Sequence, residues 1–391
     1  MRERRSIEKI LKCDGFSAYI WLTPVLIGFI ANLLKILSLG SLSGLSTMLI
    51  YLVMVYIVVS RRKQSFSISV REIIYYFIIV FALLLTILFF PQNSEPLKAA
   101  LSTSYFTIIY YFAGKSTRIK DVEDLYTISM IGVFMSFVNI TLLGELDKDM
   151  SYSYTVLPYV IISIDALFKY KRKILYIASS CIGIVLLILL STRGPLLLIA
   201  IFICYKYISN KRKIGKYVVA VLMTVAFISF IRSDLYMKTV IYIYNMLSER
   251  GIHNVMLYNY IMGRTASVDN RITYMSTVLN AVADNPLMPH GLCGDRVILN
   301  GHYSHNIICE MLYTFGGILG AGAVLHCIGR LFNLLKKTDK KNFIICLLFA
   351  FLGKLLFSGS FVSDSKLYFM IGILITIIRS KNLSQKTDGE E

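Results

Sequence analysis

The sequence has none of the short motifs that mark the common soluble enzymes and metal-binding modules. It contains no phosphate-binding loop, no nucleophile elbow and no dinucleotide-binding fingerprint, so nothing supports ATP-driven or nucleotide-driven chemistry. None of the seven cysteines forms a C-x-x-C pair, and five of them lie in apolar runs, which argues against a zinc site or a disulfide framework. Low-complexity tracts are absent, and so is an internal repeat of the kind found in two-fold transporters.

Acidic residues are scarce as well. The 391 residues include 23 Asp and Glu against 41 Lys and Arg, which gives a formal charge of +18 at pH 7. In a soluble protein this excess would suggest a nucleic acid partner. However, 56% of the residues are hydrophobic and the mean hydropathy is +0.65, far above what a soluble surface allows. The sequence therefore predicts an integral membrane protein.

Apolar runs near the length of a membrane-spanning helix recur along the whole chain. They predict about twelve transmembrane helices in a single membrane domain over residues 1–391. The runs lie at about residues 18–38, 42–60, 72–90, 97–114, 122–144, 152–168, 174–190, 194–210, 216–231, 305–329, 342–358 and 366–379. We therefore expect an all-α, polytopic membrane protein.

The Lys and Arg residues are distributed unevenly between alternate loops. One set of loops, together with both terminal tails, carries 29 of them, the other set carries 10, and Lys35 and Lys354 lie within apolar runs. Because positively charged loops stay on the cytoplasmic side, both termini should be cytoplasmic. The cytoplasmic loops are short and show no basic groove interleaved with aromatic residues, which argues against DNA or RNA binding. The first apolar run has no small-residue cleavage site after it, so we expect a helix there and not a removable signal peptide.

One connection is much longer than the others. Residues 232–304, between the ninth and tenth predicted helices, form a large extracytoplasmic loop of 73 residues. Several of its stretches are too apolar to be disordered, so we expect short helices that lie on the outer face or dip into it. The loop ends in NPLMPHGLCGD, whose Pro and Gly residues predict a turn-rich backbone.

The stretch STRGP, Ser191 to Pro195, occupies an outer turn between two predicted helices and has two interpretations. In the structural one, Ser or Thr caps the next helix, Gly194 permits the turn and Arg193 reaches lipid phosphate. In the functional one, the same helix N-terminus with an adjacent guanidinium forms an anion site suited to phosphate. The residues alone leave both open.

The large loop carries four arginines, each of which has a solvated or lipid-headgroup interpretation. As a set beside Arg193 they predict a site for a doubly charged or larger anion, because guanidinium groups bind phosphate oxygens in pairs. A lipid-linked diphosphate fits this description. The four are Arg250, Arg264, Arg271 and Arg296.

The stretch GHYSHNIICE, Gly301 to Glu310, collects proton-handling groups where the tenth predicted helix begins. Asn306 or Ser304 is suited to capping that helix, and His305 is suited to act as a general base or to orient an acceptor, and both interpretations stay open. Glu310 lies five residues after His305 and shares its helix face only loosely.

Metal binding is not supported by these patterns. A zinc site needs an i, i+4 pair or a compact His and Cys cluster, which the spacing in Gly301 to Glu310 does not supply. The DKD stretch, Asp147 to Asp149, has the spacing to hold a divalent cation, but an acidic solvated hairpin is the better interpretation.

In this order, the motifs resemble those of the O-antigen and capsular polysaccharide polymerases (Wzy-type), which share a superfamily with the O-antigen ligases. The matching elements are Thr192-Arg193-Gly194 at a helix start, an arginine ahead of a helical stretch in the large loop, a Pro…Gly-x-Gly turn, and His-Asn opening a helix that reaches a glycine. The last three are represented by Arg271, by NPLMPHGLCG with its glycines one residue wider apart than usual, and by His305-Asn306 with Gly316.

The resemblance implies a GT-C-like, metal-independent and cofactor-free glycosyltransferase in the cytoplasmic membrane. Its substrates would be undecaprenyl-diphosphate-linked oligosaccharide repeat units at the outer face, and its partners membrane lipid and the flippase and chain-length regulator of the same pathway. The resemblance also implies that His305 deprotonates or orients the acceptor hydroxyl and that arginines contact the donor diphosphate. Those arginines are Arg193 and Arg271, with Arg250 and Arg264 as further candidates, and the supporting residues are Asn306, Glu310 and Gly194.

Two other functions remain open. An O-antigen ligase would use the same donor with a different acceptor and leave the same motifs. A lipid-linked oligosaccharide flippase or another transporter would also suit twelve helices with both ends inside. A transporter is expected to carry charged residues within its helices, whereas here Lys35 and Lys354 lie near outer ends from which they can snorkel.

Overall fold

Within the described residues, all regular secondary structure is helical, which confirms the predicted all-α class. A computed structural model describes residues 20–60, 68–117, 122–141, 150–170, 174–190, 193–210, 229, 233–249, 257–258, 261–263, 268–338 and 340–387. The α-helices are α3 (Thr23–Ile36), α4 (Ser43–Ser60), α6 (Val70–Phe89), α7 (Ser94–Ser116), α8 (Val122–Thr141), α9 (Met150–Lys169), α10 (Ile174–Leu189), α11 (Arg193–Asn210), α13 (Asp234–Ser248), α15 (Val268–Asp284), α16 (Gly294–Ile298), α17 (Ile307–Phe315), α18 (Gly317–Lys337), α19 (Lys341–Leu347) and α20 (Ser365–Thr387). Short elements are η1 (Ile20–Leu22), η2 (Gly40–Leu42), η3 (Pro91–Asn93), the π-helical turn η5 (Leu348–Leu352) and η6 (Gly353–Leu356).

Three of the described helices are long and apolar enough to cross a membrane. They cover Gly40–Val59, Glu72–Phe89 and Gly317–Lys336. Most of their large side chains are exposed, as expected for helices that face lipid. The chain is therefore a helical membrane protein, and the number of twelve spans stays a prediction. Most of the predicted runs correspond to one described helix each, the run at 342–358 is divided into α19, η5 and η6, and the run at 216–231 lies outside the described residues except for residue 229.

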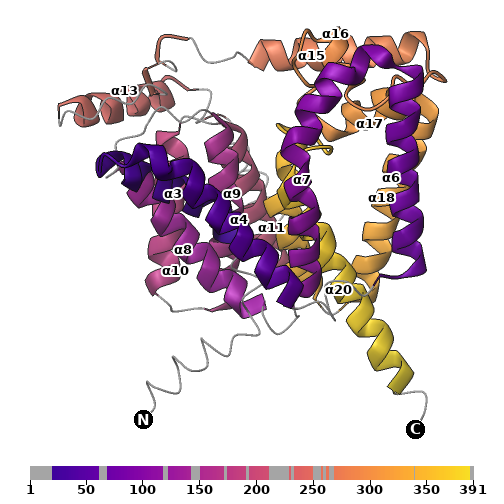
Figure 1. The fold of residues 1–391 in the computed structure, drawn as a ribbon. Coiled ribbons are helices and arrows are strands. Elements are labelled where there is room, and N and C mark those ends of the chain that lie inside the picture. The colour runs from indigo at the N-terminus through magenta and orange to yellow at the C-terminus, as the bar shows by residue number, and fades with distance from the viewer. Residues whose placement is uncertain are drawn as a thin grey trace.

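The tenth predicted run, residues 305–329, is wrong as a single helix. The chain forms α17, breaks at Gly316, and continues as α18. Gly316 has φ +82°, a left-handed conformation that a side chain would strain. α17 therefore lies beside the loop helices α15 and α16. Of the two helices formed from this run, α18 is the one that runs along the length of the molecule (Figure 1).

The main core forms around α9, which contacts α8, α10, α11 and α19. Trp21, the only tryptophan in the chain, stacks on Tyr159 of α9 with ring centroids 4.8 Å apart. Because α9 is buried, it can carry polar side chains that a lipid-facing helix would not tolerate. Its Ser163 accepts a hydrogen bond from Ser179 of α10 at 3.1 Å, for example.

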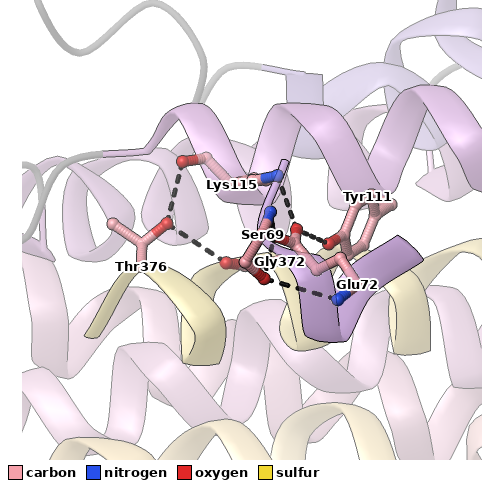
Figure 2. A network of polar contacts seen from close by, with 6 residues as sticks. All are labelled: Ser69, Glu72, Tyr111, Lys115, Gly372 and Thr376. Carbon is pink, nitrogen blue, oxygen red and sulfur yellow. Dashed lines mark hydrogen bonds and ion pairs between the residues drawn. The ribbon is translucent and has the colours of Figure 1, made fainter. Parts of the chain in front are cut away.

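A buried ion pair joins α6 to α7 at the ends far from the loop helices. The Glu72 carboxylate accepts hydrogen bonds from the Ser69 backbone N–H, the Tyr111 hydroxyl and the Lys115 ammonium (Figure 2). The Thr376 hydroxyl of α20 donates to the Lys115 carbonyl at 2.8 Å, which adds a third helix. Both charged side chains are almost fully buried, so the network links the start of α6, the end of α7 and the middle of α20 with little contact with solvent.

This network predicts a clear stability effect. Lys115→Met leaves the Glu72 charge buried without its cation, and breaking a buried pair from one side costs about 3–5 kcal/mol. We expect Lys115→Met to lower the melting temperature of the detergent-purified protein. The double variant Glu72→Gln/Lys115→Met should recover most of that loss. The control is Lys98→Met, whose pair with Glu95 is exposed and should contribute little. Equal melting temperatures for Lys115→Met and Lys98→Met would contradict the assignment.

The orientation of the chain in the membrane is tested by thiol labelling in intact cells. Cys293, the one cysteine in the predicted outer loop, cannot serve as an outer reporter, because its side chain is fully buried. Met288, which is 55% exposed in the same loop, can replace it as Met288→Cys. We expect impermeant reagents to label Met288→Cys and to leave the predicted cytoplasmic positions unlabelled. Those positions are Lys63→Cys, Arg118→Cys, Arg212→Cys and Lys337→Cys, and labelling of Arg212→Cys at the Met288→Cys level would reverse the orientation.

Candidate functional site

Residues 354–364, between the middle of η6 and the start of α20, form the centre of the candidate site; we call them the 354–364 segment. Arg271 of α15 donates to the Phe357 carbonyl at 3.3 Å, and the Asn306 side chain donates to the Leu356 carbonyl at 3.1 Å. The Tyr303 hydroxyl lies 3.3 Å from the Ser358 hydroxyl. The loop helices therefore meet the end of the membrane bundle at this segment.

Asn306 caps α17. Its backbone is extended, and its side-chain oxygen accepts hydrogen bonds from the backbone N–H groups of Ile308 and Cys309 at 2.9 and 3.2 Å. The capping interpretation is thus confirmed for Asn306 and wrong for Ser304, whose N–H instead donates to Asp295 at 2.9 Å. His305 precedes the helix and does not belong to its first turn.

His305 has a backbone conformation that side chains rarely adopt. Its φ is +57°, in the left-handed region. The residues on both sides are tied down, Ser304 to Asp295 and Asn306 to α17 and Leu356. Strained conformations of this kind persist where the surroundings hold them, and they cluster at functional sites. The two anchors therefore fix the direction of the His305 side chain.

The His305 ring lies among aromatic groups close to Arg271. It packs against Tyr303 with ring centroids 4.0 Å apart and lies nearly parallel to Tyr274 at 6.1 Å. Burial is the largest cause that lowers the pKa of His305 to about 4, with further lowering by the positive charge of Arg271 and by His302. The imidazole is therefore neutral at physiological pH and has a free lone pair. Its buried Nδ1 has no hydrogen-bond partner among the described residues.

Glu310 lies near a second carboxyl group, that of Asp295. Its oxygens accept hydrogen bonds from the Ser360 hydroxyl and from the Phe361 N–H at 3.0 Å. Burial and the nearby Asp295 charge raise the pKa of Glu310 to about 8, and burial raises the pKa of Asp295 as well. The two carboxyl groups therefore share at least one proton at neutral pH. Glu310 supports the 354–364 segment, and the sequence offered no signal for its coupling to Asp295.

The start of α11 approaches α9 next to this region. A Cβ atom on Gly194 would overlap the Tyr154 hydroxyl, so the glycine is required for this close packing. The Tyr154 hydroxyl is buried, and Arg271 lies close enough to act on it. Gly194, Tyr154 and Arg271 thus come together from three helices.

Several residues predicted for the site cannot be placed. The Arg193 side chain, Arg250 and Arg264 lie outside the described residues, as do Ser191, Thr192 and the DKD stretch. The backbone of Arg193 begins α11, next to Gly194. Their proposed roles remain predictions.

Two lysines that the sequence did not suggest lie at the same site. Lys354 was expected to snorkel toward lipid headgroups, which is wrong, because it forms an ion pair with the buried Asp364. Asp364 also accepts hydrogen bonds from the first N–H groups of α20, those of Lys366 and Leu367. The Lys366 ammonium donates to the Tyr154 carbonyl at 3.2 Å. A cluster of His, Cys, Asp or Glu that could hold a metal ion is not present in the described part of the chain.

Comparisons with known proteins do not place the chain in a family. No family model matches it, and neither does any curated protein or solved structure. The resemblance to polysaccharide polymerases therefore rests on the motifs in the sequence.

Proposed function

We propose that the protein polymerises undecaprenyl-diphosphate-linked oligosaccharide units into O-antigen or capsule at the outer face of the cytoplasmic membrane. The observation that carries this proposal is the meeting of Gly194, Arg271 and His305, three motif residues from distant parts of the sequence, at Tyr154 and the 354–364 segment. Cations gather in this region, and a neutral imidazole with a free lone pair lies close to one of them, Arg271. Such a pair of features suits a donor with an anionic leaving group and an acceptor hydroxyl.

The proposed reaction is an inverting glycosyl transfer without a metal. His305 takes or orients the proton of the acceptor hydroxyl, whose oxygen attacks the anomeric carbon of the donor sugar. The new glycosidic bond forms as the bond from that carbon to the diphosphate breaks, and undecaprenyl diphosphate leaves. Arg271 and Arg193 stabilise the charge that develops on the diphosphate, with Arg250 and Arg264 as further candidates.

A deletion strain tests the proposal and separates the two closest functions. If the chain is a polymerase, the strain should accumulate single lipid-linked repeat units. Accumulation of full-length, unligated chains would instead assign the ligase reaction. Normal polymer and no lipid-linked intermediate would contradict both.

Transport of a lipid-linked oligosaccharide is a second candidate, which two buried ion pairs favour. Glu72 pairs with Lys115, and Asp165 of α9 pairs with Lys206 of α11, so the expectation that charges within the helices are limited to Lys35 and Lys354 is wrong. Buried ionisable groups in membrane helices often mark transport pathways. The Glu72 carboxylate, however, already accepts several hydrogen bonds from its own neighbours, which suits a structural link better than a transport site.

A further inference from the structure

Lys366 is a buried cation with one hydrogen bond among the described residues. It is 6% exposed, and its ammonium group, which has three donor hydrogens, contacts the Tyr154 carbonyl at 3.2 Å. That carbonyl is available because its helical partner would be the N–H of residue 158, and Pro158 has none. A neutral donor would satisfy the carbonyl equally well, so this hydrogen bond does not explain why a charged group is buried here.

The charges around Lys366 do not balance. Lys354 and Lys366 both act electrostatically on Asp364, and Lys354 pairs with it directly. Arg271 acts on the Tyr154 hydroxyl and adds a third positive charge to this region. Two lysines therefore share one carboxylate in a mostly buried place, an arrangement that costs free energy unless an anion joins it.

One further group in this region is suited to an anion. The Tyr154 hydroxyl is buried, has no hydrogen-bond partner among the described residues, and points to the start of α11. Tyr154 thus contacts Lys366 through its carbonyl and lies near Arg271 through its hydroxyl.

We infer that Lys366, Lys354 and the Tyr154 hydroxyl form an anion site that binds a phosphate group. Asp364 is the resident counter-ion in the empty site, and the incoming phosphate shares Lys354 with it. The identity of the ligand rests on the proposed function: it is the phosphate of the donor diphosphate that Arg271 does not contact. Arg271 and the two lysines then all contact the diphosphate.

Binding of inorganic pyrophosphate to the detergent-purified full chain, measured by calorimetry, tests this inference. Wild type should bind it saturably and more tightly than orthophosphate. Lys366→Gln keeps an N–H donor for the Tyr154 carbonyl and removes the charge, so we expect about tenfold weaker binding or more, the effect of one lost charge-assisted hydrogen bond. Tyr154→Phe should also weaken binding. The control Lys98→Gln removes an exposed lysine and should bind like wild type.

Melting temperatures without pyrophosphate separate a binding role from a structural one. Lys366→Gln should melt at or above the wild-type temperature, because a poorly compensated buried charge is gone and the carbonyl keeps a donor. Lys366→Met leaves the carbonyl without a donor and should melt lower. Unchanged pyrophosphate affinity in Lys366→Gln, or no saturable binding by wild type, would overturn the inference.

The same experiment distinguishes this inference from the proposed function. If Arg271→Gln loses pyrophosphate binding while Lys366→Gln keeps it, the lysine site is wrong and the proposed diphosphate donor stands. If Lys366→Gln loses binding while a deletion strain makes normal polymer, the anion site stands and the polymerase is wrong.

Discussion

His305→Ala is expected to lower the turnover of the purified protein by about 10²–10⁴-fold, the range for a lost general base. The physical reason is that the neutral His305 ring, fixed by anchors on both sides, would accept the proton of the acceptor hydroxyl. Affinity for the lipid-linked donor should survive, since Arg271 and the lysines remain. Turnover and donor affinity are measured on the same preparation.

The matched control is His302→Ala. Its ring is exposed and stacks on Tyr274 at 5.2 Å, and it should change turnover much less. Equal, mild losses in the two variants would make His305 structural. Activity abolished by chelators would restore the metal interpretation.

The pH profile gives a second readout for His305. An ordinary histidine is protonated as the pH falls through about 6.5. The pKa of His305 is lowered to about 4, so the imidazole should stay neutral, and competent as a base, until the pH falls to that value. Turnover should therefore fall only when the pH drops to about 4. A fall in turnover near pH 6.5 that is absent in His305→Ala would contradict the buried environment of His305.

Arg271→Lys is expected to reduce polymer formation at least about tenfold while the amount of protein in the membrane stays normal. Lysine keeps the charge but loses the two-pronged guanidinium that binds phosphate oxygens, and a charge-assisted hydrogen bond contributes about 1.5–3 kcal/mol. Arg271 also donates to the Phe357 carbonyl, so the melting temperature of the variant must be checked. Polymer length and yield are measured in a deletion strain that carries each variant.

Arg330→Lys is the control for Arg271→Lys. Arg330 is exposed in the second half of α18, which leads away from α17, so this variant should make normal polymer. If Arg271→Lys and Arg271→Ala both keep normal polymer, the arginine does not contact the diphosphate.

The positions of most helices outside the large loop could be predicted from the sequence because they follow apolar runs. The run at 174–190 became α10 (Ile174–Leu189), and the run at 194–210 became α11. Hydropathy averages over a window, so it cannot show where one apolar run contains two helices. The break at Gly316 was missed for this reason, since the residues on both sides are apolar and only the backbone angle differs.

The site was predictable where short-range patterns carry it. Asn306 was a candidate cap because its side chain reaches backbone groups a few residues ahead, and this is what the structure contains. Pairing between distant side chains leaves no such pattern. The sequence cannot tell whether Lys354 extends to lipid or folds back on Asp364, nor that Pro158 frees a carbonyl for Lys366.

Reconstitution of the purified protein in liposomes with undecaprenyl-diphosphate-linked repeat units tests the central claim most directly. The lipid-linked units are supplied on the outer face, a metal chelator is present, and both the saccharide chain length and the released undecaprenyl diphosphate are measured. The account predicts that chains lengthen and that one undecaprenyl diphosphate is released for each unit added, with both lost in His305→Ala. Movement of the lipid-linked units across the bilayer without chain growth would contradict it and assign the protein to transport.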